Sequence, residues 1–317
     1  MAGIENVGSE YSGVPLVLTA GVYYTDPDNV RFKTSLEFAE NARDEGVPAV
    51  IIDASPEKAP ENREGWAPTW VADAHRNSGA TVLRAKVPGI ASQRQEGVAY
   101  AVGQGAEKVV GTESEKPLIP FYAGQFALAL DSADILVIGR TPEAEASMPP
   151  LQRRTERLAG WILNTAMNMP EDALAGPRGF TVAGAEVLAD YPSDQRDLNN
   201  WLYMYMTVFA AWSRDLRVGG TAANFVYPEG MVAEETNNPT FDTKRLDQFH
   251  MQLAQLIPRG QAYANTVMRS DVLAVTEAHL PLVSPAYDLD FRLEKFGLLE
   301  KRLADIYKYQ PPQTEAA

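Results

Sequence analysis

The chain has 317 residues, 45% hydrophobic and 22% charged, so it can bury a large core as a globular protein of one or two domains. Its formal net charge of −14 argues against a nucleic-acid backbone as the main partner. Cysteine is absent, which excludes disulfides, a thiol nucleophile and cysteine-ligated zinc.

The N-terminus is polar and lacks the basic-then-apolar pattern of a signal sequence. We expect residues 1–13 to be a flexible leader. No apolar run approaches the ~20 residues that a membrane-spanning helix needs. The sequence therefore predicts a cytoplasmic protein without a membrane span.

Short apolar runs alternate with helical patterns in the first part of the chain, where Asp26-Pro27 is expected to open the first helix. This alternation predicts an α/β fold with a mainly parallel sheet flanked by helices. The predicted strands cover residues 14–20, 47–52, 80–83 and 109–113.

Three residues follow or close these strands, namely Ala20, Asp53 and Glu113. In open parallel sheets, ligands bind beyond the carboxyl ends of the strands. We therefore expect the ligand site at this edge of the sheet.

Glu113 and Glu115 stand two positions apart in an E-x-E motif that Pro117 closes. Alternation along an extended chain puts both carboxylates on one side, about 7 Å apart at the backbone. Such a pair can hold one hard divalent cation together with waters and a phosphate. The alternative is a solvated acidic turn.

The remaining elements are a fifth strand, a long helix with three arginines on a face expected to be solvated, two further strands and several helices. Arg140 closes the fifth strand and can reach a phosphate; the alternative is an ion pair. These elements cover residues 133–138 (strand), 151–165 (helix with Arg153, Arg154 and Arg157), 176–184 (strand and loops), 198–212 (helix), 218–226 (strand) and 227–241 (polar loop).

The predicted domain organisation is a catalytic domain over residues 14–241, a C-terminal helical region over residues 242–309 and a disordered tail over residues 310–317. The C-terminal helices are also a candidate surface for homo-oligomer formation.

Four sequence segments, in the same order along the chain, resemble motifs of the nucleotide-sugar glycosyltransferases of the A-type fold, in particular of the family-2-like and mannosylglycerate-synthase-like branches. The match covers roughly the first 140 residues. The pieces are Leu18-Thr19-Ala20-Gly21, Ile51-Ile52-Asp53-Ala54-Ser55, a glycine-led helix start with Arg94, and Glu113-Ser114-Glu115 in place of the family's D-x-D.

The resemblance implies a glycosyltransferase that takes a sugar from a nucleotide diphosphate donor and passes it to an acceptor that the sequence does not identify. Ala20 would line the nucleotide site, Asp53 would read the base, and Arg94 and Arg140 would neighbour the diphosphate. Glu113 and Glu115 would hold Mn²⁺ or Mg²⁺ on it.

The metal motif departs from the family's in two places. Glutamates replace its aspartates, and Tyr227 stands where many relatives have a histidine ligand. Two rival functions therefore stay open: a non-catalytic domain that binds a nucleotide sugar or a protein, and a sugar-1-phosphate nucleotidyltransferase. The second rival would need a glycine-rich first loop ending in a basic residue, and residues 21–26 have neither feature.

An inverting transferase needs a general base near the acceptor hydroxyl. The candidate is Asp197, on the flank of the helix predicted from residue 198, whereas Asp194 is expected to cap that helix. The alternative for Asp197 is a solvated first-turn acid. The mannosylglycerate-synthase-like branch retains configuration, which would leave Asp197 a positioning role only.

Overall fold

The computed structural model describes residues 13–56, 70–170, 172–195, 198, 200–263, 270–307 and 309. The predicted leader, apart from Gly13, and the predicted disordered tail lie outside the described residues.

A seven-stranded sheet forms the centre of the first part of the chain, in the order β3-β2-β1-β4-β6-β5-β7. Strand β1 pairs in parallel with β2 and β4, and β2 pairs in parallel with β3, whereas β6 is antiparallel to β4 and β5. The predicted fold class, an α/β fold with a mainly parallel sheet flanked by helices, is confirmed. The strands are β1 Val17–Val22, β2 Ala49–Asp53, β3 Thr81–Arg84, β4 Lys108–Glu113, β5 Ile135–Arg140, β6 Arg178–Thr181 and β7 Val218–Ala223.

The chain divides into two compact units, one of residues 1–138 and 176–225, the other of residues 139–175 and 226–317. The first contains the sheet up to Ile138 and the helices α1 Val30–Asp44, α2 Trp70–Asn77, α3 Ile90–Gly103, η1 Ile119–Tyr122, α4 Ala123–Ala129, α7 Val182–Ala189 and α8 Tyr203–Trp212. The second contains α5 Pro142–Ala146, α6 Pro150–Met167, α9 Glu229–Thr236, α10 Pro239–Tyr263, α11 Ser270–His279, η2 Leu280–Val283 and α12 Leu289–Tyr307.

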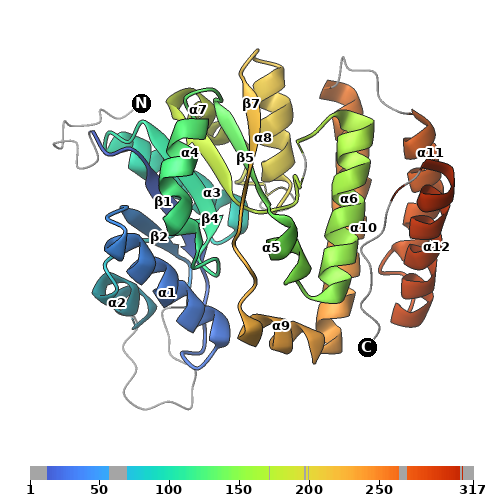
Figure 1. The fold of residues 1–317 in the computed structure, drawn as a ribbon, viewed down its shortest axis with the longest axis horizontal. Coiled ribbons are helices and arrows are strands. Elements are labelled where there is room, and N and C mark those ends of the chain that lie inside the picture. Colours follow the sequence, from blue (N-terminus) through green and yellow to red (C-terminus); the bar gives the residue numbers. More distant parts are fainter. Residues whose placement is uncertain are drawn as a thin grey trace. The chain divides into compact units, whose positions relative to one another are not determined.

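In the first unit, helices cover both faces of the sheet: α1 and α4 lie on one face and α3 lies on the other (Figure 1). All five residues of β2 are buried, and Val50, Ile51 and Ile52 are fully buried. Strands that are buried on both faces read as continuous apolar runs, which is why the sequence revealed them.

In the second unit, α6 packs with α10 and α11, and α12 packs with α10 and α11. The prediction that the arginine face of α6 is solvated is wrong for Arg154, because this residue makes an ion pair with the buried carboxylate of Glu300 on α12. The predicted domain boundary at residue 241 stays a prediction, but α6 shares its compact unit with the C-terminal helices.

Several predicted boundaries were wrong for local reasons. The first helix begins at Val30, where the Asn29 side chain accepts a hydrogen bond from the Arg31 N–H, and not at Asp26-Pro27. The expected loop 227–241 contains α9, which begins after Pro228 with Glu229 in its first turn. The helix expected from residue 198 begins at Tyr203, so Asp194 lies in an exposed turn well before it and does not cap it.

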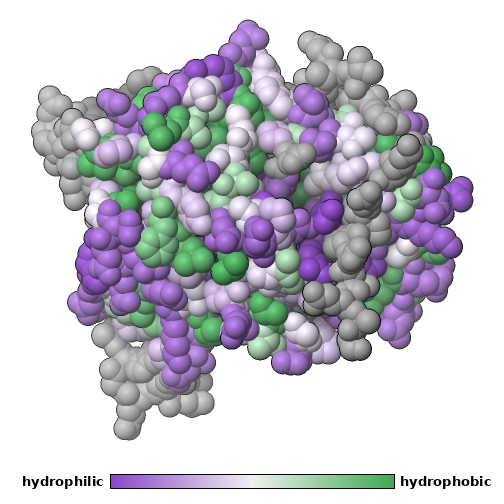
Figure 2. Space-filling view, in the orientation of Figure 1, coloured by the Kyte–Doolittle hydropathy of each residue, from purple (hydrophilic) through white to green (hydrophobic). Residues whose placement is uncertain are grey.

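On the face seen in Figure 2, apolar residues lie in small patches between hydrophilic ones. Among the helices that the structure describes, none is long and apolar enough to cross a membrane.

Candidate functional site

The carboxyl ends of β1, β2 and β4 meet at one edge of the sheet. Val22 of β1 is paired with Asp53 of β2, and Gly21 of β1 is paired with Glu113 of β4. Asp53 and Glu113 therefore lie on either side of β1, two strand spacings or about 10 Å apart. The sequence-based expectation that these strand ends meet at one edge is confirmed.

This edge is also where the strand order reverses. From β1 the chain proceeds through β2 to β3 on one side of the sheet, and it then places β4 on the other side of β1. A crevice forms outside such a switch point because the connections on its two sides leave in opposite directions. The β1/β4 boundary is thus the position in this sheet where a ligand is best accommodated.

A chain of hydrogen bonds joins the three strand ends. The Ser55 N–H donates to Asp53 Oδ1 at 2.8 Å, and the Tyr24 N–H donates to Ser55 Oγ at 2.9 Å. The Tyr24 hydroxyl lies 3.2 Å from Ser114 Oγ and donates to Glu115 Oε1, also at 3.2 Å. We call these five residues the strand-edge network. They link the base-reading candidate Asp53 to the E-x-E motif.

Asp53 is buried at 4% exposure, and its second oxygen lies 3.5 Å from Arg84 Nη1. Arg84 is half-exposed and also lines a hollow of about 650 Å³ between the end of β3 and α3, together with Lys86 and Tyr100. Asp53 itself does not line this hollow, and its predicted contact with the base stays a prediction.

The prediction that Ala20 closes the first strand is wrong: β1 continues to Val22, and Ala20 is buried within it at 2% exposure, paired with Ile51 and Thr112. The next residue, Gly21, lies against Gln93, whose Nε2 donates to the carbonyls of Val22 and Ile52 at 3.0 and 2.8 Å. The start of α3 is therefore anchored to the ends of β1 and β2. The predicted nucleotide contact of Ala20 stays a prediction.

Glu113 is enclosed at the end of β4. Its Oε2 lies 3.2 Å from Lys116 Nζ, and a Cβ added to Gly176 would overlap its Oε1. Burial alone would raise the pKa of the Glu113 carboxyl, but the positive charges of Lys116 and Arg94 bring that pKa below its usual value. Glu113 is therefore ionised at neutral pH.

Glu115 has the opposite shift. Burial raises the pKa of its carboxyl; Arg31 opposes this, and the nearby charge of Glu113 adds to it. Neighbouring carboxylates whose pKa values move in opposite directions are common at functional sites, although ion-pair networks show the same behaviour.

Arg94 lies inside the first unit rather than on the surface. Its Nε donates to the Tyr203 hydroxyl at 3.0 Å, and its Nη1 donates to the carbonyls of Thr19 and Thr112. Gly111 makes room for it, since a Cβ there would overlap Arg94 Cδ. Arg94 thus supplies positive charge to Glu113 from below the strand edge, and its predicted contact with a diphosphate stays a prediction.

The two glutamates do not fit a divalent cation as they are arranged. A hard cation held by two carboxylates, with waters and a phosphate as its other ligands, needs carboxylate oxygens that are turned toward it. Glu113 is paired with Lys116, Glu115 accepts from Tyr24, and no group of three acidic or histidine side chains suited to a metal occurs in the described part of the chain. The predicted Mn²⁺ or Mg²⁺ site stays a prediction.

Arg140 belongs to the second unit. Its Nε donates to Asp172 Oδ2 at 2.8 Å, and its Nη1 lies 2.7 Å from Glu156 Oε2. Burial would lower the pKa of this guanidinium, but Asp172 and Glu156 hold it well above its usual range. Within the described residues, the guanidinium is thus engaged by two carboxylates, and its predicted role near a diphosphate stays a prediction.

Asp197, the predicted general base, lies outside the described residues. The structure adds residues that the sequence did not single out, above all Tyr24, Lys116 and Tyr203. A glycine inside the apolar run Val109-Val110-Gly111 was the one available signal, because such a glycine often marks the close approach of another group, here Arg94.

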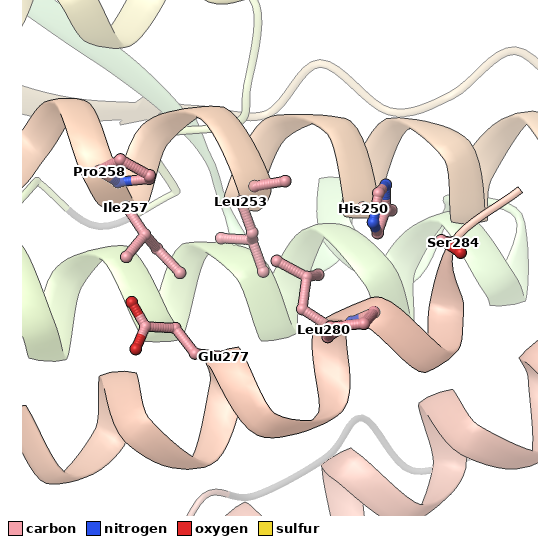
Figure 3. Close-up of a pocket in the computed structure, with 9 residues that line it drawn as sticks. His250, Leu253, Ile257, Pro258, Glu277, Leu280 and Ser284 are labelled. Carbon is pink, nitrogen blue, oxygen red and sulfur yellow. The ribbon is translucent and has the colours of Figure 1, made fainter.

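The second unit contains a separate cavity of about 320 Å³ between α10, α11 and η2. Figure 3 shows Leu253, Ile257 and Leu280 around it, with His250 and Glu277 as its titratable side chains. None of the predicted site residues lines it.

Comparison with solved structures finds distant similarities. A protein assigned as a nucleotide-diphospho-sugar transferase from Desulfovibrio desulfuricans G20 has 10% sequence identity and a TM-score of 0.41, over 78% of this chain and 98% of its own. The 4-diphosphocytidyl-2C-methyl-D-erythritol synthase of Anaerococcus prevotii DSM 20548 has 9% identity and a TM-score of 0.41, over 70% and 97%. A UDP-glucose pyrophosphorylase solved with UDP-glucose has 10% identity and a TM-score of 0.35, over 67% and 90%.

At these identities and TM-scores the similarities do not identify an activity. No protein-family model matches the chain, and no curated protein matches it.

Proposed function

We propose that this chain is a transferase that moves a sugar from a nucleotide diphosphate sugar to an acceptor hydroxyl. The observation that carries the proposal is the strand-edge network at the switch point between β1 and β4. It combines buried carboxylates and hydroxyl groups, with a lysine beside them, at the position where open α/β sheets bind ligands. The order of the four sequence motifs supports the same function.

In this proposal Asp53 reads the nucleotide base. Its carboxylate accepts a hydrogen bond from the Ser55 N–H and pairs with Arg84, a residue that lines the hollow. A carboxylate at this position accepts a hydrogen bond from a base N–H, which is a charge-assisted bond. Ligands that lack such an N–H would lose this hydrogen bond and bind less well.

The positive charge for the diphosphate would come from the β4 end of the same edge. Lys116 pairs with Glu113 there, and Arg94 adds its charge from below. Departure of the nucleoside diphosphate develops negative charge on its terminal phosphate, which fixed cations stabilise in the transition state. Asp197 remains the predicted base for the acceptor hydroxyl if the reaction inverts the anomeric centre.

The function is tested by incubating the full chain with a panel of nucleotide diphosphate sugars and simple hydroxyl acceptors, and by measuring free nucleoside diphosphate. We expect release with one donor class, and NMR of the product then gives the anomeric outcome. In parallel, nucleoside triphosphates are incubated with sugar 1-phosphates. Pyrophosphate from that mixture, without release from the donors, would identify a nucleotidyltransferase instead. Binding of a donor without any release would identify a non-catalytic domain.

A further inference from the structure

The side chain of Lys116, just after the end of β4, contacts both a carboxylate and an aromatic ring. Its Nζ lies 3.2 Å from Glu113 Oε2 and 5.4 Å from the centre of the Phe225 ring. Both side chains of the ion pair are largely buried, at 17% exposure for Lys116 and 18% for Glu113. The ammonium is thus held at the strand edge by a carboxylate and an aromatic face.

A divalent cation on Glu113 would compete with this ammonium. The carboxylate is enclosed on its other side by Gly176, because its Oε1 fills the space that a side chain at position 176 would take. A cation bound there would also face the ammonium of Lys116, 3.2 Å from Oε2, and the guanidinium of Arg94, which lies against Gly111 and donates to the Thr112 carbonyl of the same strand. Two cations and one enclosed carboxylate leave little attraction for a third cation.

The other half of the E-x-E motif does not compensate. Glu115 Oε1 accepts a hydrogen bond from the Tyr24 hydroxyl, and that hydroxyl also lies 3.2 Å from Ser114 Oγ. No third acidic or histidine ligand completes a metal group within the described ranges. A lysine ammonium, by contrast, binds phosphate as a point charge and needs no fixed ligand geometry.

We infer that Lys116, supported by Glu113 and Phe225, takes the place of a divalent cation at this edge, so that a nucleoside diphosphate binds here without metal. Glu113 then acts as a positioning residue for Lys116 and not as a metal ligand. The inference rests on the proposed function, since it names the group that receives the diphosphate of the proposed donor.

The test is isothermal titration of the full chain with UDP, GDP, ADP and CDP, in EDTA and with Mn²⁺ in excess. We expect the best ligand to bind in EDTA with an affinity within about twofold of that in Mn²⁺. Lys116→Gln should weaken binding by about tenfold or more, and Lys116→Arg should restore part of it. Lys33→Gln, on the exposed face of α1, is the matched control and should leave the affinity unchanged.

Mn²⁺ alone is the second probe, followed by the electron paramagnetic resonance signal of the free ion. We expect no loss of that signal on adding the wild-type chain. A tenfold or greater gain of nucleotide affinity with Mn²⁺, or loss of the free-ion signal that Glu113→Gln abolishes, would overturn the inference and leave the proposed function standing. Binding of no nucleoside diphosphate in either condition would overturn both. The wild-type measurements need no variant, so poor folding of Lys116→Gln does not prevent a decision.

Discussion

The ends of β4 and β5 make an instructive pair, because each strand closes on a charged residue that the sequence placed near a phosphate or a metal. At the end of β5, Arg140 meets two carboxylates, Asp172 and Glu156, and each guanidinium nitrogen has a partner. At the end of β4, Glu113 meets Lys116, while Glu115 accepts from the neutral hydroxyl of Tyr24. The first arrangement is that of an internal ion cluster, and the second keeps a cation at the switch point of the sheet.

The difference shows that a charged residue after a buried strand does not identify a site by itself. What matters is how completely its neighbours satisfy it, and those neighbours come from other parts of the chain: Asp172 is 32 residues from Arg140, and Glu115 is 91 residues from Tyr24. Three changes test these two arrangements and the neighbouring end of β2: loss of the Arg140 guanidinium, loss of the Asp53 charge, and a change of pH.

The largest effect is expected at the ion cluster of Arg140, Asp172 and Glu156 at the end of β5. Arg140→Met leaves Asp172 and Glu156 close together without their shared cation, which should lower the free energy of unfolding by about 3–5 kcal/mol in urea denaturation. Arg157→Met is the control in the same unit, because Arg157 is 42% exposed and its ion pair with Glu145 should contribute only about 0–1 kcal/mol. An Arg140→Met protein as stable as wild type but weaker in nucleotide binding would instead support the predicted phosphate contact.

An intermediate effect is expected at Asp53, and on binding rather than on stability. Asp53→Asn keeps an oxygen for the Ser55 N–H but removes the charge, so nucleoside diphosphate affinity should fall by about 1.5–3 kcal/mol in calorimetry. Asp73→Asn, in an exposed ion pair with Arg76, is the control and should bind like wild type. If Asp53→Asn keeps full affinity, Asp53 does not read the base.

The smallest effect is expected from pH, with opposite signs at the two glutamates. The folded-state pKa of Glu113 is lowered, so its contribution to stability is present above the ordinary value of 4.5 and is lost as pH falls through the lowered value. The pKa of Glu115 is raised, so its contribution is present below 4.5 and is lost as pH rises through the raised value.

Unfolding free energies measured across the acid range should therefore change in different ways in two variants. Glu113→Gln should remove part of the gain in stability that accompanies rising pH, and Glu115→Gln should remove part of the loss. Identical profiles for the two variants would show that the carboxylates do not differ as the geometry implies.

The fold class could be predicted because the strands are buried on both faces and therefore appear as short apolar runs, as in Val50-Ile51-Ile52. The meeting of Asp53 and Glu113 at one edge followed from the same pattern. The first residues of helices were harder to predict from the sequence. Helix α8 begins at Tyr203, although the residues before it already have the apolar spacing of a helix. Helix α9 lies in a polar stretch that was predicted to be a loop.

The side-chain contacts at the carboxyl edge of the sheet could be predicted only in part. Glu113 contacts two residues, Lys116 and Gly176. Lys116 is close to it in the sequence, whereas Gly176 is far away and reaches it only because β6 runs antiparallel beside β4. Arg94 is predicted to neighbour a diphosphate because it lies early in a helix, and the sequence did not show that the absence of a side chain at Gly111 makes room for it beside β4.

The fit between Glu113 and Gly176 has a consequence for how this sequence can change over time. Any side chain at position 176 would occupy the volume that the Glu113 carboxylate now fills. The two positions are therefore coupled: alanine at 176 requires the Glu113 carboxylate to leave this space, and that carboxylate is the group that anchors Lys116. A substitution at this glycine would thus change where charge is placed at the sheet edge.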